Sequence, residues 1–303
     1  MQIKALHCFL EIARSSSLRQ AAQRLDIAPT ALNRQLASLE YYFRAELLDR
    51  GVSGIRLTEA GRLLAERARL IDADIQTTRA LIDDLRGLDR GHVNILAAGA
   101  VAGGVLAPVL ADLHVRHPGL RFSVRVTSAA ELAAGVADGS ADLGITIFAP
   151  ETATPLVQSR HPIDHKVIVS PGHALAGAGC VSLATLSRHA LALPDTGFGA
   201  RQDLDRMARA ASLRLDPVFV TGSLGMQKAL ALRGAAALVL PPLCCQDEIE
   251  AGRLVAVTMS PDSTIETTLD VCRAPGRTLP HAAGAVMRAL DAVLGSSART
   301  QPG

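Results

Sequence analysis

The first forty residues of this chain contain three short helical patterns in close succession, and few folds accommodate three helices so near one another in sequence. Apolar side chains recur at helical intervals from Ile3 to Ala13. Ser17 stands where an N-cap would begin a second short helix, and Pro29 suits the first position of a third. The third helix turns three leucines inward: Leu32, Leu36 and Leu39. We therefore predict a helix-turn-helix with its turn at residues 25–28.

The outward face of the third helix carries Thr30, Asn33 and Arg34, all near its N-terminal end. Asparagine pairs bidentately with adenine, and arginine pairs with guanine or with a phosphate. Residues 1–58 hold 8 basic and 5 acidic side chains, a small excess that favours a polyanion. Because the chain has no Trp, two Tyr and six Phe, a single-strand stacking platform is disfavoured, and we expect double-stranded DNA. The alternative is an ordinary solvated helix face.

Four strings continue this pattern: AAQRLDIAPTALNRQL at residues 21–36, LE at 39–40, LLDR at 47–50 and LTEAG at 57–61. In this order they resemble the winged helix-turn-helix of LysR-type transcriptional regulators. The resemblance covers the whole N-terminal part and implies a DNA-binding domain over residues 1–58. The DNA-contacting residues that we expect are Ser17, Arg19, Pro29, Thr30, Asn33, Arg34, Arg50, Ser53 and Arg56.

Residues 51–57 contain glycines where a turn needs positive φ, and we interpret this segment as the hairpin called the wing. Arg50 and Arg56 would then lie near phosphates or a narrow minor groove. For Arg56, a simple role in solubility is an equal alternative.

The N-terminal strings depart from the family at three places. Ala28-Pro29-Thr30 stands where the family often has Ser-Gln-Pro or Ser-Gln-Ser, so a glutamine that could read a base is absent. Serine is common in the family at the place of Asn33, so an operator sequence cannot be carried over. Arg44 replaces a usual glycine, and we expect the third helix to end by another geometry than a glycine cap.

Residues 59–90 are interpreted as one long helix, which Thr58 can cap. Seven of its positions follow a strict 4-3 alternation, and six of them are apolar: Leu64, Ala68, Ile71, Ile75, Thr78, Ile82 and Leu85. Such a stripe is typical of a helix that pairs with a second helix. The alternative is that it packs on its own domain. The resemblance implies pairing, hence a homodimer that presents two reading heads to a dyad-symmetric DNA site.

Beyond residue 91, apolar strand-like runs alternate with helical stretches, which is typical of βαβ units. Strands are expected at residues 92–98, 121–127 and 142–147, with helices at 101–116 and 129–137. A second series places strands at 166–169, 190–193, 218–221 and 237–240, and helices at 200–211, 224–233 and 243–251. A strand at 267–273 and a helix at 279–294 return to the first lobe.

The predicted fold class is therefore α/β with an all-α N-terminal part. A winged helix-turn-helix is followed by a long linker helix and by an effector domain at residues 91–303. That domain has two lobes, about 91–160 plus 268–295 and about 161–267. The resemblance implies that it is similar to periplasmic binding proteins and holds a small inducer, often a carboxylate, between the lobes.

The effector cleft is expected outside the C-terminal ends of the strands, where helix N-termini bind anions. The residues that this rule selects are Gly99, Ala100, Val101, Thr127, Ser128, Phe148, Gly197, Phe198, Thr221 and Ser223. Ser223 could instead only cap the helix that follows it. Many family members have Ser or Thr just after the first strand, but residues 99–104 supply none, so a polar anchor is missing.

Other chemistry finds little support in the sequence. Gly222-Ser223-Leu224-Gly225 lacks the preceding glycine of a nucleophile elbow, so we expect no enzyme. His114/His117 and His161/His165 lack the Glu of a metalloprotease motif, and Pro162 disfavours a helix through the second pair. We expect surface histidines, no metal and no cofactor.

The five cysteines are scattered and lack any C-x-x-C spacing, which favours reduced thiols and the cytoplasm. No export signal is visible at the start of the sequence. Residues 93–111 carry no charge over about the length of a bilayer span, yet glycines and Pro108 interrupt them, so we expect a strand-turn-helix and no membrane partner.

These patterns together predict a cytoplasmic transcriptional regulator whose operator binding or DNA bending is modulated by a small molecule. We expect it to form a dimer through the linker helix and a tetramer beyond that, with RNA polymerase as a further partner. The alternative is a two-lobed solute-binding protein or enzyme without a role in DNA binding.

Overall fold

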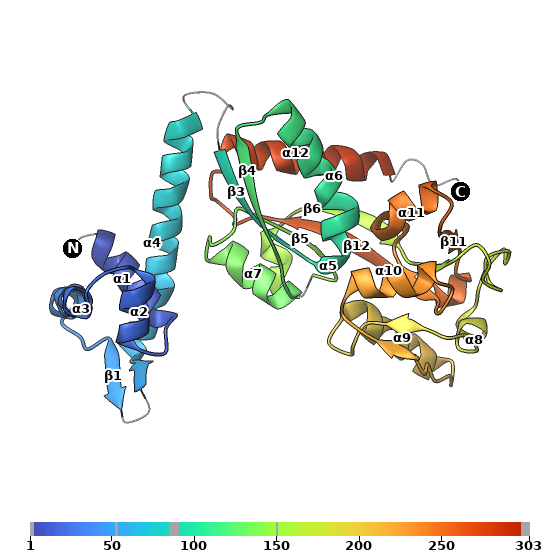
Figure 1. Cartoon of the computed structure of the whole chain (residues 1–303), viewed down its shortest axis with the longest axis horizontal. Coiled ribbons are helices and arrows are strands. Elements are labelled where there is room, and N and C mark those ends of the chain that lie inside the picture. Colours follow the sequence, from blue (N-terminus) through green and yellow to red (C-terminus); the bar gives the residue numbers. More distant parts are fainter. Residues whose placement is uncertain (1–2, 52–53, 85–90, 150, 298–303) are drawn as a thin grey trace. The chain divides into compact units, whose positions relative to one another are not determined.

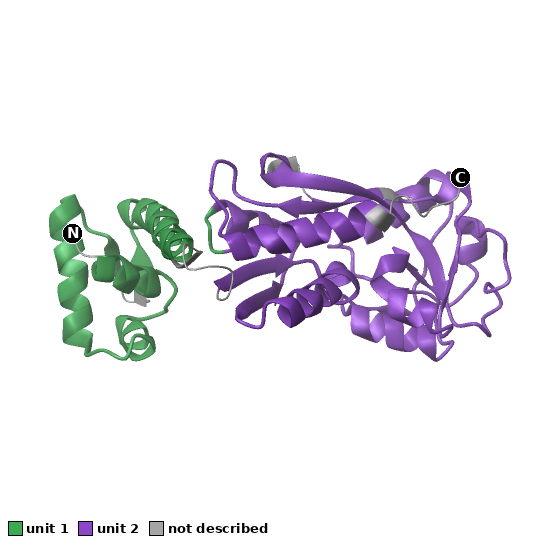
Figure 2. Ribbon diagram, turned by 90° about the horizontal axis from the view of Figure 1, so that it is seen from above, with its two compact units in different colours: residues 1–85, 138–140 green, residues 86–137, 141–303 purple. Residues whose placement is uncertain are grey.

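The computed structural model of the chain describes residues 3–51, 54–84, 91–149 and 151–297. It forms two compact units, residues 1–85 with 138–140 and the remainder, which are coloured separately in Figure 2. Each unit is described by itself below. Two residues named in the sequence analysis lie outside the described residues: Ser53 of the expected DNA interface and Leu85 of the expected 4-3 stripe.

The N-terminal unit begins with the three expected helices, α1 (Ile3–Ala13), α2 (Leu18–Arg24) and α3 (Pro29–Phe43). The hydroxyl of Ser17 caps α2 by accepting the backbone N–H of Gln20 at 3.2 Å. Pro29 occupies the first turn of α3, where a missing N–H costs no hydrogen bond. The helices bury one core, which contains Phe9 and Ile12 of α1 and the expected inward leucines of α3, Leu32, Leu36 and Leu39.

Helix α3 ends at Arg44, and here the expectation of another geometry is wrong. Arg44 itself adopts the left-handed conformation with φ 52° and ψ 39°, the geometry that a glycine would take. Its N–H lies against the carbonyl oxygens of Glu40 and Tyr41, and the next N–H, from Ala45, donates to Glu40 at 3.1 Å. The cap therefore persists without glycine, at the cost of a strained arginine backbone.

Arg44→Gly is expected to stabilise the N-terminal unit by about 1 kcal/mol, because glycine adopts positive φ without the Cβ clash. The measurement is urea denaturation followed by far-UV circular dichroism. Arg44→Ala serves as the control, since it removes the same charge but keeps a Cβ. Equal midpoints for the glycine and alanine variants would show that the strain at this position is negligible.

The wing and the long helix follow α3. Strands β1 (Leu48–Gly51) and β2 (Gly54–Leu57) pair antiparallel, so the hairpin begins earlier than the segment that the sequence suggested. Helix α4 (Glu59–Asp84) is capped as expected, because the Thr58 hydroxyl accepts the N–H of Gly61 at 2.9 Å. The same hydroxyl donates to the carbonyl of Glu46 at 2.7 Å, which ties the start of α4 to the residues before β1.

Burial along α4 divides the expected 4-3 stripe. Leu64 and Ala68 are buried in the core of the N-terminal unit, so their assignment to a dimer seam is wrong. The alternative, packing on their own domain, holds for this first part of the helix. Farther along, Ile71 is 40% and Ile82 53% exposed. Their assignment to an interface stays a prediction.

The second unit contains a five-stranded sheet in the order β4-β3-β5-β12-β6. Strand β3 pairs parallel with β4 and β5, and β12 runs antiparallel to β5 and β6. The strands are β3 (Gly91–Ala97), β4 (Leu120–Val126), β5 (Leu143–Ile147), β6 (Val157–Asp164) and β12 (Glu266–Cys272). The expected parallel βαβ units of this lobe are therefore confirmed.

Helices cover both faces of this sheet (Figure 1). Helices α6 (Ala107–Arg116) and α12 (His281–Ser297) pack on one face, and α7 (Ala129–Ala137) packs on the other. Successive side chains of β3 point to opposite faces of the sheet. Ile95 therefore packs in the core under α6 and α12, and Leu96 packs in the core under α7. A one-turn helix α5 (Gly99–Val101) and a π-helix η1 (Ala102–Leu106) lead into α6. The charge-free stretch at 93–111 is thus the expected strand-turn-helix, and none of the described helices meets the length and hydropathy of a membrane span.

The second lobe is built on smaller sheets. Strand β7 (Lys166–Val169) lies antiparallel between β10 (Leu238–Leu240) and β11 (Val255–Val257), while β8 (Ala192–Leu193) pairs parallel with β9 (Phe219–Val220). The two longer helices are α9 (Gly199–Ala210) and α10 (Leu224–Leu232). Shorter turns complete the lobe: α8 (Leu183–Leu186), η3 (Pro242–Cys245), α11 (Gln246–Glu250) and η4 (Pro261–Ser263).

Strand β6 was missed by the sequence analysis. It lies at the edge of the five-stranded sheet, where Pro162 is tolerated because its missing N–H need not serve a second neighbour. The chain passes from β6 directly through His165 into β7, and it returns through Ile265 into β12. The two passages are joined by the N–H of His165, which donates to the carbonyl of Ile265 at 3.3 Å.

Candidate DNA interface and effector site

The face of α3 opposite the buried leucines is open to solvent. Pro29, Thr30, Asn33 and Arg34 are all exposed. Within the described part of the chain, no ion pair engages Arg34, whereas Arg24 on α2 is paired with Glu11 at 3.1 Å. The guanidinium of Arg34 is thus available to an external acceptor.

The other expected DNA contacts in the described residues belong to the start of α2 and to the β1–β2 hairpin. Arg19 on α2 and Arg56 on β2 are exposed, and the Ser17 side chain is engaged as the cap of α2. Arg50 lies in β1, opposite Ile55 in the hairpin register. The Ser17 cap holds the first turn of α2 in place, and helix N-termini are common phosphate contacts.

The expected effector residues all follow strand ends. Gly99 and Ala100 come after β3, Thr127 and Ser128 after β4, and Phe148 after β5, so the three groups share one edge of the parallel sheet. In the second lobe, Gly197 and Phe198 follow β8, and Thr221 and Ser223 follow β9. Val101 also follows β3, but its side chain is fully buried in the first-lobe core, so its side chain is wrong as a ligand contact.

Phe148 joins the two lobes. It adopts positive φ, 59°, and its ring packs against the cores of both lobes. A Cβ built on Gly199, at the start of α9, would lie 2.6 Å from Cγ of Phe148, so the glycine makes room for the ring. The ring centroid also lies 5.6 Å from that of His165. Phe148 therefore reaches from the first-lobe sheet edge to the N-terminus of α9.

Local hydrogen bonds occupy the polar side chains at these strand ends. The Ser223 hydroxyl accepts the N–H of Met226 at 3.3 Å, so the capping alternative for Ser223 holds. The Thr221 hydroxyl accepts the N–H of Ser223 at 3.2 Å. Thr127 donates to Glu131, and this bond together with the neighbouring Ser128 lowers the pKa of the Glu131 carboxyl. By contrast, no side chain caps α9, whose first N–H groups remain open to another acceptor.

His165 is buried, so its expected place on the surface is wrong. It is 3% exposed, and its Nδ1 has no hydrogen-bond partner among the described residues. Burial lowers its pKa from 6.5 to about 4, although the Ile265 carbonyl and the nearby Asp203 and Asp164 oppose the shift. The imidazole is therefore neutral at physiological pH.

Neutral burial of His165 predicts acid sensitivity of the second unit. Below pH 6.5 the unfolded chain binds the proton before the folded chain does, so stability falls with pH down to the folded pKa of about 4. We expect wild type to lose about 2 kcal/mol between pH 7 and pH 5 beyond what His165→Leu loses. Urea denaturation at several pH values measures this difference. Parallel pH profiles for the two proteins would contradict the assignment.

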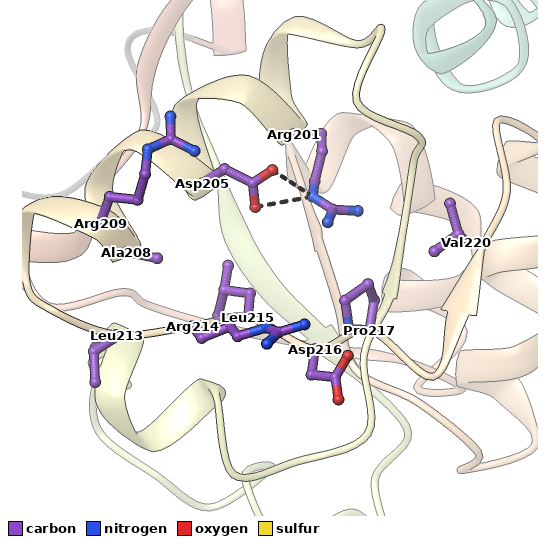
Figure 3. A pocket seen from close by; sticks show the side chains of 10 residues that line it. All are labelled: Arg201, Asp205, Ala208, Arg209, Leu213, Arg214, Leu215, Asp216, Pro217 and Val220. Carbon is purple, nitrogen blue, oxygen red and sulfur yellow. Dashed lines mark hydrogen bonds and ion pairs between the residues drawn. The ribbon is translucent and has the colours of Figure 1, made fainter.

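A cavity of about 400 Å³ opens on the second lobe away from the expected effector residues, none of which lines it (Figure 3). Arg201 at its wall is 9% exposed, and its Nε lies 3.0 and 2.9 Å from the two carboxylate oxygens of Asp205. A further Arg201 nitrogen donates to the carbonyl of Pro194 at 3.1 Å. The lining residues are Arg201, Asp205, Ala208, Arg209, Leu213, Arg214, Leu215, Asp216, Pro217 and Val220. Because Asp205 and the Pro194 carbonyl already satisfy the buried Arg201 guanidinium, we interpret this wall of the cavity as structural.

A Ser, a His and an Asp meet between β6 and α12, but not as a catalytic triad. The Ser159 hydroxyl donates to Oδ1 of Asp291 at 2.6 Å, and Nε2 of His161 lies 3.1 Å from the same oxygen. In a triad the histidine must accept the serine proton, which this arrangement does not provide. The cluster instead fastens α12 to the sheet. Among the described residues, no group of three or more His, Cys, Asp and Glu is placed to hold a metal ion.

The thiols are mostly buried. Cys8, Cys244, Cys245 and Cys272 lie inside the fold, and only Cys180 is exposed. Burial raises the pKa of Cys245 and of Cys272 to about 11, which leaves these thiols protonated and unreactive at neutral pH.

Comparison with known proteins agrees with both units. Residues 3–62 match the model "Bacterial regulatory helix-turn-helix protein, lysR family", and residues 86–295 match "LysR substrate binding domain". A "SDS degradation transcriptional activation protein" of Pseudomonas sp. is 28% identical over 311 residues, which covers 99% of this chain and 98% of the relative. A "RuBisCO operon transcriptional regulator" of Allochromatium vinosum is 28% identical over 207 residues, 68% of each chain.

Solved structures show the same fold. Full-length CbnR in complex with its target DNA has a TM-score of 0.64 at 19% identity, covering 96% of this chain and 99% of that one. A full-length OxyR variant from Pseudomonas aeruginosa has a TM-score of 0.69 at 17% identity, covering 96% and 97%. The expected resemblance is thereby confirmed over both units. The chain belongs to the LysR family and is a DNA-binding transcriptional regulator with a substrate-binding domain.

Proposed function

We propose that α3 reads the operator through Thr30, Asn33 and Arg34, with Arg19 and the wing residues Arg50 and Arg56 contacting the backbone. The exposure of the three α3 side chains, opposite the buried leucines of the same helix, carries this proposal. Had these side chains been buried, α3 could not enter a major groove. Contacts from Ser17, Pro29 and Ser53 complete the proposed footprint.

We infer that two copies pair through the distal part of α4. Ile71, Ile75, Thr78 and Ile82 continue the 4-3 spacing beyond the residues buried in the N-terminal core, and Ile71 and Ile82 leave large apolar surfaces in water. Pairing these side chains across a two-fold axis would remove that surface from solvent. We further propose that the dimers associate to a tetramer and that the protein contacts RNA polymerase. We also propose that it acts in the cytoplasm and is not an enzyme.

The effector is proposed to bind at the strand ends of the second unit, between Gly99, Thr127 and Phe148 of the first lobe and Phe198 and Thr221 of the second. Ala100, Ser128, Gly197 and Ser223 complete this set. The uncapped start of α9 supplies backbone donors that favour an anionic group. Binding would change operator affinity or DNA bending by favouring one lobe arrangement over another, typically by about 1 to 3 kcal/mol.

The test of this function begins with selection of duplexes from a random-sequence library by the full-length chain. Footprinting on the selected duplex follows, with and without a panel of small carboxylates and at two salt concentrations, since phosphate contacts alone weaken steeply with salt. A dyad-symmetric footprint that one metabolite alters supports the proposal. Ligand binding together with purely nonspecific, salt-sensitive DNA affinity would favour the alternative, a two-lobed solute-binding protein.

A further inference from the structure

The C-terminal end of α3 carries an exposed aromatic run. Tyr41 is 86%, Tyr42 58% and Phe43 42% exposed. The chain has only two tyrosines and no tryptophan, so both of its tyrosines stand here in the solvent. Tyrosine is enriched at interfaces, and contiguous exposed apolar side chains mark interaction sites.

Helical spacing places Tyr41 on the face proposed to read DNA. At about 100° per residue, Thr30, Arg34 and Tyr41 fall within a stripe about 40° wide, and Ala37 lies beside it. This stripe is opposite the buried Leu32, Leu36 and Leu39, and its three residues and Ala37 are all exposed.

Tyr42 differs from Tyr41 in both direction and surroundings. It is turned by about 100° from Tyr41 around the helix axis. Its ring packs edge-on against Phe43, with centroids 5.0 Å apart and planes at 83°. Tyr42 is therefore engaged within the N-terminal unit, whereas Tyr41 extends from the DNA-reading stripe.

The distance between Thr30 and Tyr41 along α3 indicates that the two residues contact different parts of the duplex. The two residues are separated by about 16 Å along the helix, because each residue rises about 1.5 Å. The major groove is about 12 Å wide, so with Thr30 over base edges a helix crossing the groove would carry Tyr41 to the bordering backbone. Tyrosine hydroxyls are common phosphate donors.

Resting on the proposed DNA-reading role of α3, we propose that Tyr41 is a further DNA contact, whose phenolic hydroxyl donates a hydrogen bond to a phosphate oxygen at the groove edge. The contact fixes the position of α3 on the duplex and carries no base specificity. Because the phenol is neutral, it adds affinity without releasing a counterion of its own.

The first test compares Tyr41→Phe with Tyr42→Phe in the full-length chain on a selected duplex and on an unrelated duplex. Tyr41→Phe is expected to weaken binding to both by the same factor, about fivefold or more, with an unchanged salt slope. Tyr42→Phe is expected to bind as wild type. Wild-type affinity of Tyr41→Phe for both duplexes would overturn the proposal, as would a loss confined to the selected duplex.

The second test uses the scarcity of tyrosine. Incorporation of fluorotyrosine gives only two fluorine NMR signals, and Tyr41→Phe identifies which belongs to Tyr41. Duplex DNA is expected to shift the Tyr41 signal and to leave the Tyr42 signal nearly unchanged. A Tyr41 signal that does not respond at saturating DNA would overturn the proposal.

Arg34→Ala separates this inference from the function on which it rests. If wild type binds no duplex, both fail. If Arg34→Ala loses affinity while Tyr41→Phe does not, the DNA-reading role of α3 stands and the Tyr41 contact is refuted. Thermal unfolding of each variant provides the folding control, and no change is expected because both side chains are exposed.

Discussion

Arg34→Ala is expected to weaken binding to a selected operator duplex by about 10- to 100-fold. A bidentate arginine contact discriminates by about 1 to 3 kcal/mol, and the guanidinium on α3 is exposed with no ion-pair partner among the described residues. The loss should be accompanied by a shallower dependence of log affinity on log salt, by about one for each phosphate contact removed. Fluorescence anisotropy of labelled duplexes at several salt concentrations measures both quantities.

Arg24→Ala is the matched control for this experiment. It removes an equal charge from the same unit, but Arg24 is already paired with Glu11, so the effect on affinity should be small. Arg34→Lys separates the two forms of contact, because lysine keeps the charge for a phosphate but loses the bidentate fork for guanine. Identical affinities for wild type, Arg34→Ala and Arg24→Ala would remove α3 from the DNA interface.

Local patterns predicted the N-terminal unit well because short-range interactions define it. Ser17 and Thr58 cap the helices that they precede, and Pro29 opens α3. The exposed face of α3 follows from the positions of its buried leucines, which a 3.6-residue period fixes. The end of the helix was misjudged, because the surrounding fold holds Arg44 in a conformation that its own preference disfavours.

Long-range packing explains the other errors. The 4-3 stripe of α4 serves two purposes in succession, a core at Leu64 and Ala68 and then an exposed face, and spacing alone does not show where one ends. Pro162 disfavoured a helix and no strand was predicted around it, but β6 lies on a sheet edge that accepts a proline. His165 was placed at the surface and Val101 in the effector cleft, because their burial depends on the opposing lobe or on the helices above the sheet, which are distant in sequence.

The lobes of the second unit meet at η1, which lies within the helix expected at residues 101–116. Pro108 has no N–H to continue the α-helical pattern, and the preceding residues form the π-helix η1, closed by the N–H of Ala107 on the carbonyl of Ala102. Gly104 within η1 lies directly against η3 of the second lobe. A Cβ built on Gly104 would lie 2.1 Å from the carbonyl oxygen of Leu243 and 3.0 Å from Cα of Cys244.

Gly104→Ala is therefore expected to destabilise the second unit by about 3 kcal/mol, because the overlap is with backbone that no rotamer change can relieve. Gly103→Ala is the adjacent control, since a Cβ there meets no atom within 4 Å, and alanine should be neutral or slightly stabilising in a helix. Differential scanning calorimetry of the full chain measures both variants. Equal midpoints would show that small backbone shifts relieve the overlap at no cost. A selective loss for Gly104→Ala identifies the η1–η3 contact as the packing that an effector-driven lobe movement must preserve or release.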